Sequence, residues 1–212
     1  MSHKSFVSAA IAGLFLLSFS GRKIYAQAEI SKLEAGVQIS VLRHNGSAYS
    51  FAFLDPQSGP DLTDVGVGGR IAYYVTRNVS FEVEVNFFPR ELPTSQSRTQ
   101  GLFGMKAGRR FNKVGVFGKV RPGFVSFSKG RLPDPLVPGG GLFITFPGKT
   151  VFALDLGGVI EIYHSRHFFS RLDFGNTSIR TTDQVAVNGG SFKAVGVTKS
   201  NFQFSAGMGF RF

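Results

Sequence analysis

The sequence contains no cysteine and no tryptophan. The absence of cysteine excludes disulfide bonds, thiolate metal sites and a lipid anchor on an N-terminal cysteine. The mean hydropathy of +0.07 leaves no helical membrane span hidden in the composition. The chain is nevertheless rich in large apolar side chains, with 24 phenylalanines among 212 residues. This length is enough for one domain.

Acidic residues are also scarce, with 13 against 24 lysines and arginines, and the formal net charge is +11. A soluble protein of this charge would suggest a nucleic-acid partner. The cations, however, are dispersed through apolar segments and do not form a basic cluster. We therefore expect no nucleic-acid partner.

Residues 1–28 have the features of an export signal that is removed. A short basic start precedes an apolar core from Phe6 to Phe19, which is too short to span a bilayer as a helix. An Ala-Gln-Ala cleavage pattern ends at Ala28, where we expect the cut. Cuts after Ala26 or Ser20 stay open, because two basic residues separate the apolar core from this pattern. Removing the segment removes three cations and no acid, so the net charge falls from +11 to +8.

The last stretch of the chain, Ser200 to Phe212, alternates strictly between apolar and polar residues. The apolar set is Phe202, Phe204, Ala206, Met208, Phe210 and Phe212. The polar set is Asn201, Gln203, Ser205, Gly207, Gly209 and Arg211. A period of two predicts a strand with one apolar and one polar face.

Seven further segments alternate in the same way and predict seven more strands. They are Leu33–Arg43, Val65–Val75, Val79–Phe88, Gln100–Arg110, Val114–Phe124, Thr150–Tyr163 and His167–Gly175. Because Pro122 cannot donate a ladder hydrogen bond, we expect a bulge or a strand end there.

The connections alternate between long and short. The long ones are predicted as loops and are Asn45–Thr63, Pro89–Thr99, Ser128–Lys149 and Asn176–Lys199. The short ones are turns at Arg77-Asn78, Asn112-Lys113 and His164–Arg166. Eight strands with this rhythm are typical of an outer-membrane barrel, with short turns on the periplasmic side and long loops outside. A soluble eight-stranded barrel also alternates but faces its apolar residues inward.

The terminal strand carries a family resemblance. Its C-terminal aromatic, with Phe202, Phe204, Met208, Phe210 and Phe212 alternating back from the end, resembles the assembly signal of bacterial outer-membrane barrels. Residues 29–212 as a whole look like the small OmpA/OmpX-type barrels. The resemblance implies an all-β, eight-stranded, antiparallel up-and-down transmembrane barrel in the outer membrane. It also implies outer-membrane lipid, lipopolysaccharide and the barrel-assembly machinery as partners, and we expect a monomer with no cofactor or metal.

The polar face predicts a side-chain-filled interior. Seven cations and six acids on it leave a charge of +1, and buried charges need partners. The residues predicted to interlock are Arg70, Glu82, Glu84, Lys106, Arg110, Lys119, Arg121, Asp155, Glu161, Arg171 and Asp173. An eight-stranded barrel is just wide enough for its own side chains. The remaining charge lies on the long loops, at +3, and on the turn side, at +4.

Two short motifs could carry chemistry, and neither fits. Gly148-Lys149-Thr150 ends like a phosphate-binding loop but lacks its first glycine and opens a strand. His164-Ser165-Arg166-His167 with Glu161 has the residue types of a hydrolase triad but falls in a predicted periplasmic turn. We therefore expect a non-enzymatic protein acting in envelope structure, adhesion or ligand contact through its long loops. A narrow porin-like channel and a lipid A-modifying enzyme are the alternatives.

Overall fold

The computed structural model describes residues 32–44, 62–91, 96–133, 143–187 and 191–212. The predicted export signal and nearly all of the loop Asn45–Thr63 lie outside these ranges. All regular structure in the described residues is β-strand. These residues include no helix that could cross a membrane.

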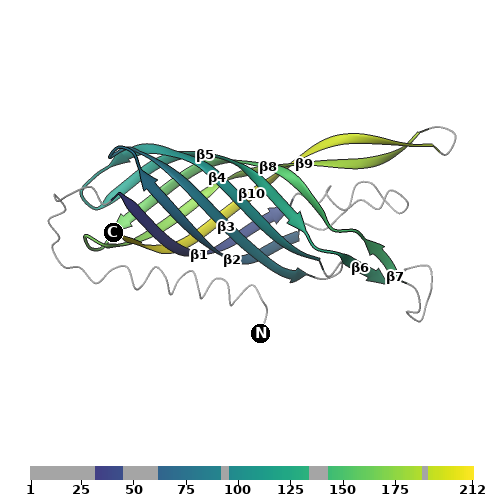
Figure 1. Cartoon of the computed structure of the whole chain (residues 1–212), viewed down its shortest axis with the longest axis horizontal. Helices are drawn as coiled ribbons and strands as arrows, with labels where there is room; N and C mark the ends of the chain where they lie inside the picture. Colours follow the sequence, from purple (N-terminus) through teal and green to yellow (C-terminus); the bar gives the residue numbers. More distant parts are fainter. Residues whose placement is uncertain (1–31, 45–61, 92–95, 134–142, 188–190) are drawn as a thin grey trace.

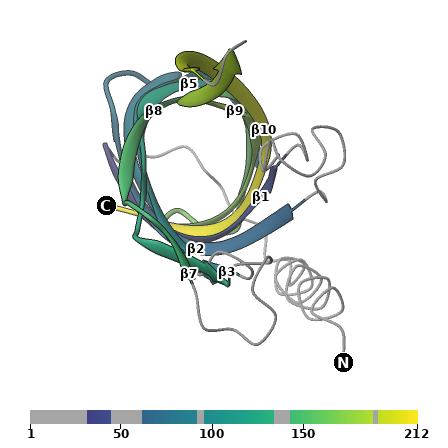
Figure 2. The same ribbon diagram turned by 90° about the vertical axis from the view of Figure 1, so that its right-hand side faces the viewer.

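Eight strands close into one antiparallel barrel, in the order β1-β10-β9-β8-β5-β4-β3-β2 (Figure 1). They are β1 (Leu33–His44), β2 (Leu62–Tyr74), β3 (Val79–Glu91), β4 (Gln96–Arg110), β5 (Val114–Phe127), β8 (Lys149–Tyr163), β9 (Phe168–Val187) and β10 (Ser191–Arg211). Figure 2 looks along the barrel and shows the closed ring. The first and last strands pair with each other, from Glu34 opposite Arg211 to Arg43 opposite Phe202. The predicted eight-stranded up-and-down barrel is confirmed.

The apolar face of each strand points outward. Val83 on β3 is 58% exposed, whereas its chain neighbours Glu82 and Glu84 are each 1% exposed. On β10, Phe202 and Phe210 are exposed and Gln203 and Ser205 are buried. A soluble barrel would show the reverse pattern.

Two of the predicted loops are shorter in the structure than expected from the sequence, because strands extend into them. The strands β3 and β4 run into the predicted loop Pro89–Thr99, to Glu91 on one side and from Gln96 on the other. The register shifts between Phe88 and Glu91, which fits a proline that cannot donate to the ladder. The predicted loop Asn176–Lys199 is almost entirely strand, because β9 and β10 continue as a two-stranded ribbon from Asn176↔Phe202 to Val187↔Ser191. This ribbon projects past the barrel in Figure 1.

The predicted loop Ser128–Lys149 contains a small sheet of its own, β6 (Gly130–Pro133) paired with β7 (Phe143–Phe146). The expectation at Pro122 is also wrong. Strand β5 continues through it, and the β4–β5 register is the same at Gly123↔Leu102 as at Val120↔Met105. The unbroken ladder with β8, in which Pro122 lies opposite Leu154, holds the strand in place.

The end opposite the ribbon, here called the turn end, carries three tight turns. In the β2–β3 turn, the Thr76 hydroxyl accepts hydrogen bonds from the backbone N–H groups of Asn78 (3.2 Å) and Val79 (3.1 Å). In the β8–β9 turn, Ser165 accepts from His167 (3.3 Å) and Phe168 (2.9 Å) in the same manner. The end with the ribbon and the β6–β7 sheet is called the loop end.

Candidate functional site

Inward-facing side chains fill the barrel in three layers from the turn end to the loop end. The charged core consists of Glu34, Arg70, Glu82, Glu84, Lys106, Arg110, Lys119, Arg121, Asp155, Glu161, Arg171, Asp173 and Arg211. The amide layer above it consists of Gln38, Ser40, Asn86, Gln100, Thr177, Gln203 and Ser205. The apolar cap, nearest the loop end, consists of Leu42, Phe88, Val125, Ala153 and Ile179.

Arg171 is fully enclosed near the centre of the charged core. Its two terminal nitrogens donate to the two carboxylate oxygens of Glu82, at 2.6 and 2.9 Å. The Nη2 atom also donates to Asp173, at 2.8 Å. This two-pronged geometry is the strongest form of an arginine–carboxylate pair. It ties β9 to β3, which are not neighbours in the barrel wall.

Arg121 and Lys119 on β5 share a second group of acids. Arg121 donates to Asp155 through Nε (2.8 Å) and Nη2 (2.6 Å), and to Glu84 through Nη1 (2.6 Å). Lys119 forms ion pairs with Asp155, at 2.7 Å, and with Asp173. Since all of these side chains are buried, each acid neutralises cations that have no access to water.

Lys106 lies beside Lys119 in the β4–β5 register, so two like charges face the same interior. Lys106 is neutralised separately, by Glu161 and by Glu82 at 3.1 Å. Its ammonium also lies over the Tyr74 and Phe117 rings, 5.0 and 4.7 Å from their centroids. Cation–π contacts of this kind are strongest away from water.

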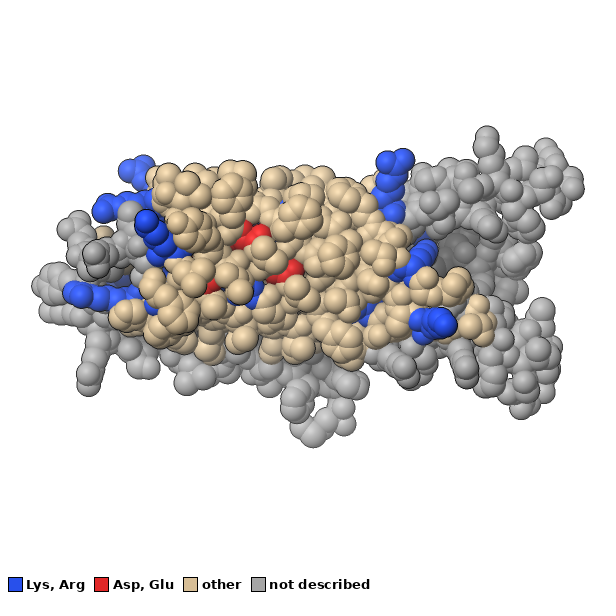
Figure 3. All heavy atoms as spheres, viewed as in Figure 1, with Lys and Arg blue, Asp and Glu red and all other residues tan. Residues whose placement is uncertain are grey.

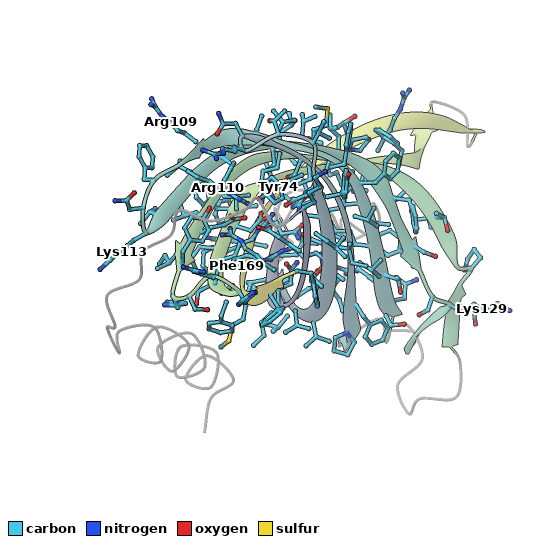
Figure 4. All side chains as sticks on the ribbon, turned by 60° about the vertical axis from the view of Figure 1, so that its left-hand side comes forward. Tyr74, Arg109, Arg110, Lys113, Lys129 and Phe169 are labelled. Atoms are coloured by element: carbon cyan, nitrogen blue, oxygen red, sulfur yellow. The ribbon has the colours of Figure 1, made fainter. Side chains whose placement is uncertain are left out.

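The charged core ends at the turn end in a group of arginines stacked on aromatic rings. Arg110 lies 3.9 Å from the centroid of Tyr74, and Arg211 lies 4.1 Å from that of Tyr163. Both arginines also bond to Glu34, at 2.8 and 2.7 Å. Figure 4 shows Arg110 and Tyr74 within the barrel, while Arg109 and Lys113 point away from it.

Arg70 differs from the other cations of the charged core. Among the described residues it forms no ion pair, and Nη1 donates to the Gln38 side chain at 3.3 Å. Its guanidinium lies over the Phe169 ring, 5.5 Å from the centroid. A Cβ on Gly36 would approach the Arg70 guanidinium to 3.2 Å, so the absence of a side chain there leaves it room.

The amide layer is a network of mostly neutral hydrogen bonds centred on Asn86. Its Nδ2 donates to Glu84 (2.7 Å) and to Gln100 (2.9 Å), and its Oδ1 accepts from Gln38 (2.9 Å) and Ser40 (3.0 Å). Gln100 and Gln203 donate to each other across the lumen, at 3.0 and 3.2 Å. These bonds join β1, β3, β4 and β10 and close the passage above the charged core.

One further buried ion pair lies at the level of the apolar cap, between Arg98 on β4, which is opposite Phe88 in the register, and Asp64 on β2, which is opposite Leu42. Arg98 was predicted to lie in the loop Pro89–Thr99. This prediction is wrong, because Arg98 belongs to strand β4. If the alternation is continued back from the inward-facing Gln100, Arg98 falls on the inner face, so the sequence pattern could have identified this residue. Leu42, Phe88 and Val125 are each 1 to 2% exposed, so little of this layer is open to solvent.

The structure places all eleven of the predicted interlocking residues on the inner face. Ten of them form ion pairs with described residues, and Arg70 does not. Glu34 and Arg211 were counted among the charges of the polar face but were not among the eleven residues named as interlocking. They form an ion pair at 2.7 Å.

The residues that resemble a hydrolase triad do not assemble into one. The Ser165 hydroxyl accepts backbone hydrogen bonds of its own turn, and His164 contacts Ser170 at 2.8 Å. His167 stacks on Phe210, at a centroid distance of 5.5 Å. Glu161 lies inside the barrel, paired with Lys106. The described residues also contain no group of His, Asp and Glu that could hold a metal ion.

The residues of the predicted assembly signal form the outer face of β10. Phe202 is 55% exposed, Phe210 46% and Phe212 65%, while Phe204 and Met208 are half-buried. Phe210 and Phe212 meet edge to face, with centroids 5.1 Å apart. The residues of the signal thus lie on one continuous strip of the outer wall.

No protein-family model matches this sequence, and no curated protein sequence matches it. Among solved structures the chain is similar to Neisserial surface protein A, with a TM-score of 0.56, 11% identity, and coverage of 85% of this chain and 97% of that one. It also matches Ail, the attachment invasion locus protein of Yersinia pestis, with a TM-score of 0.49, 13% identity, and coverage of 86% and 100%. At such low identities the likeness shows the fold alone. That fold is the one expected from the resemblance to small OmpA/OmpX-type outer-membrane barrels.

Proposed function

We propose that this protein is a non-enzymatic outer-membrane barrel that acts in envelope structure, adhesion or ligand contact through its loop end. The observation that supports the proposal is that polar side chains fill the interior and apolar side chains cover the outside, the reverse of the arrangement in a soluble protein. The buried residues of this barrel include paired charges and amides, and its outer wall carries exposed Val, Ile and Phe side chains. An apolar outer wall is stable where it meets hydrocarbon and not water.

The distribution of charge on the outside supports a membrane setting. Figure 3 shows the described lysines and arginines mainly toward the two ends, with mostly uncharged residues between them. Exposed aromatics accompany both ends, Tyr73 and Phe168 toward the turns and Phe87 and Phe202 toward the loops. Aromatic girdles at both edges of an apolar band are typical of outer-membrane barrels.

The filled interior favours surface contact over transport. The charged core and the amide layer both cross the lumen, and their central side chains Arg121, Arg171, Gln100 and Gln203 are each at most 1% exposed. A solute would have to break several buried ion pairs to pass. The loop end, by contrast, presents the ribbon of β9 and β10 and the β6–β7 sheet beyond the barrel.

Planar-bilayer recording tests this proposal against the porin-like alternative. We expect the purified protein to insert without a steady single-channel current, while a porin reconstituted in parallel conducts. A large, steady current from the unaltered protein would overturn the filled-barrel proposal and favour the channel.

Cell fractionation tests the location. We expect the protein in the outer-membrane fraction, with faster gel migration before heating because the folded barrel resists detergent. Replacing Phe212 with Ser should lower the membrane level more than the rate of synthesis, if the terminal strip is read during assembly. Recovery of the unaltered protein as a soluble periplasmic species would contradict the membrane assignment.

Replacing the ribbon residues 180–199 with a short turn tests the contact role. Adhesion of cells to protein-coated and uncoated surfaces should fall to the level of cells without the protein, while heat-modifiable migration of the barrel persists. A matched replacement of the turn Arg77-Asn78 with Asn-Gly should leave adhesion unchanged. Equal adhesion with and without the loop-end segments would contradict contact through the loop end.

A further inference from the structure

The three turns at the turn end carry four exposed cations and no acid. Arg77 lies in the β2–β3 turn, Arg109 and Lys113 flank the β4–β5 turn, and Arg166 lies in the β8–β9 turn. None of the four forms an ion pair with a described residue. Because they belong to three different turns, they are spread around the rim rather than gathered at one point. We call these four residues the cationic collar.

Arg109 fixes the position of this collar relative to the outer wall. It continues the outward row of β4 after Phe103, Met105 and Ala107, and its register partner on β5 is Val116, which is 49% exposed. Its guanidinium lies 5.9 Å from the centroid of the Phe111 ring. A cation on a lipid-facing row is tolerated where its head can reach the polar interface. The apolar band therefore ends at the level of Arg109.

Exposed aromatics accompany the collar on the same rim. Phe111 is 57% exposed beside Arg109, Tyr73 is 50% exposed before Arg77, and Phe168 is 39% exposed after Arg166. Rings of this kind sit at the headgroup level of a bilayer. Lys113 and Arg166 lie two residues from Phe111 and Phe168 on the turn side, Arg77 lies four residues beyond Tyr73, and Arg109 lies beside Phe111. The four cations therefore share the rim with these rings, at the level where phosphate groups lie.

We propose that the cationic collar is a binding site for anionic phospholipids, whose headgroup phosphates pair with these four residues in the leaflet at the turn end. The inference rests on the membrane location proposed above and adds the lipid class and the leaflet. Arginine and lysine both pair with phosphate oxygens by charge-assisted hydrogen bonds. The loop end is less suited to this role, because the sequence of its long connections mixes acids with cations.

The absence of native tryptophan allows a local test. A single reporter, Phe111→Trp, is placed beside Arg109, and a second, Phe202→Trp, on the outer wall near the loop end. Each protein is reconstituted in mixed vesicles in which either phosphatidylglycerol or phosphatidylcholine carries bromine, a quencher of tryptophan fluorescence. Tyr73→Trp serves as a second turn-end reporter if Phe111→Trp does not fold.

We expect the turn-end reporter to show a preference of about fivefold for phosphatidylglycerol over phosphatidylcholine, as one engaged cation near the surface would give. Arg109→Gln with Lys113→Gln should abolish this preference and leave quenching by total brominated lipid unchanged. Lys129→Gln with Lys149→Gln, the matched loss of two exposed loop-end cations, should preserve it.

The outcomes separate this inference from the proposed function. No quenching at either reporter would mean that the barrel does not meet lipid, which overturns both. Quenching without a preference for the anionic lipid overturns only the collar. An equal preference at both reporters, or one that survives Arg109→Gln with Lys113→Gln, would show general attraction to a basic protein and overturn the assigned site.

Discussion

The charged core and the amide layer close the same lumen by different chemistry. In the charged core all the acids except Glu84 pair with two or three cations, as Asp173 does with Lys119, Arg121 and Arg171. In the amide layer most bonds are between neutral groups, and Gln100 and Gln203 donate to each other. An unpaired buried charge costs far more than an unpaired buried amide. The two layers should therefore respond very differently to the loss of one side chain.

Both layers connect strands that are not neighbours in the wall. Arg171 joins β9 to β3, and Gln203 joins β10 to β4. Strand number and register set the diameter of the barrel, and contacts of this kind add direct links between its opposite walls. We therefore expect the cross-lumen contacts to add rigidity in both layers, and the size of each mutational effect to depend on charge.

The largest effect is expected from removing an acid of the charged core. Glu161→Ala leaves Lys106 without its nearest acid and removes a bond to the Tyr163 hydroxyl, at 2.9 Å. The free energy of unfolding should fall by about 3–5 kcal/mol, as for other broken buried pairs. Urea unfolding in lipid vesicles, followed by gel mobility, measures it. Arg166→Ala, an exposed control in a turn, should change little, and a similar small effect for Glu161→Ala would contradict a buried network.

The second-largest effect is expected from a substitution on the outer wall, at the level of Glu82 and Glu84. Val83 lies between Glu82 and Glu84 in the chain but is 58% exposed on the outer wall. Val83→Arg should lower the free energy of unfolding in vesicles by about 2–4 kcal/mol, because the new cation faces hydrocarbon. Val83→Leu should be nearly neutral. If Val83→Arg were equally neutral, the outer wall would have to face water.

A smaller effect is expected in the amide layer. Asn86→Ala removes four hydrogen bonds, those with Gln38, Ser40, Glu84 and Gln100. Since most of the partners left behind are neutral, the loss should be about 1–3 kcal/mol in the same unfolding measurement. Asn112→Ala, in an exposed turn, is the matched control. A fall in the free energy of unfolding larger than that caused by Glu161→Ala would contradict the expectation that the charged core is the more sensitive layer.

Alternation and the rhythm of the connections predicted the barrel. The export signal, the terminal Phe and the near-balance of charge on the polar face decided that this face points inward, with Glu82 and Glu84 inside and Val83 outside. A period of two by itself assigns each residue only to one of two faces. It could not decide where strands end above the barrel. The segment Asn176–Lys199 was predicted as a loop, whereas its β-branched residues continue the ribbon.

Pairing within the interior was less predictable than its composition. Near-balance of charge indicated that cations and acids interlock, but which acid each cation meets depends on barrel stagger. Arg70 shows this limit, since it faces Gln38 and Phe169 rather than a carboxylate. The Arg98–Asp64 pair was missed because both were assigned outside the predicted strands.

The smallest effect comes from removing both members of the amide pair. Gln203→Leu alone leaves the Gln100 Nε2 group without its acceptor and should cost about 1–3 kcal/mol. Gln100→Leu with Gln203→Leu removes both polar groups, so the double variant should cost about 1 kcal/mol, and less than the sum of the single changes. A residual cost remains because two donors lose their acceptors, Thr177 the Gln203 oxygen at 2.8 Å and Asn86 the Gln100 oxygen at 2.9 Å. Urea unfolding of the two single variants and the double variant measures the coupling, and bilayer current should stay absent because the charged core still crosses the lumen.

Strictly additive losses would show that the two amides do not depend on each other, and a current in the double variant would show that the amide layer alone closes the barrel.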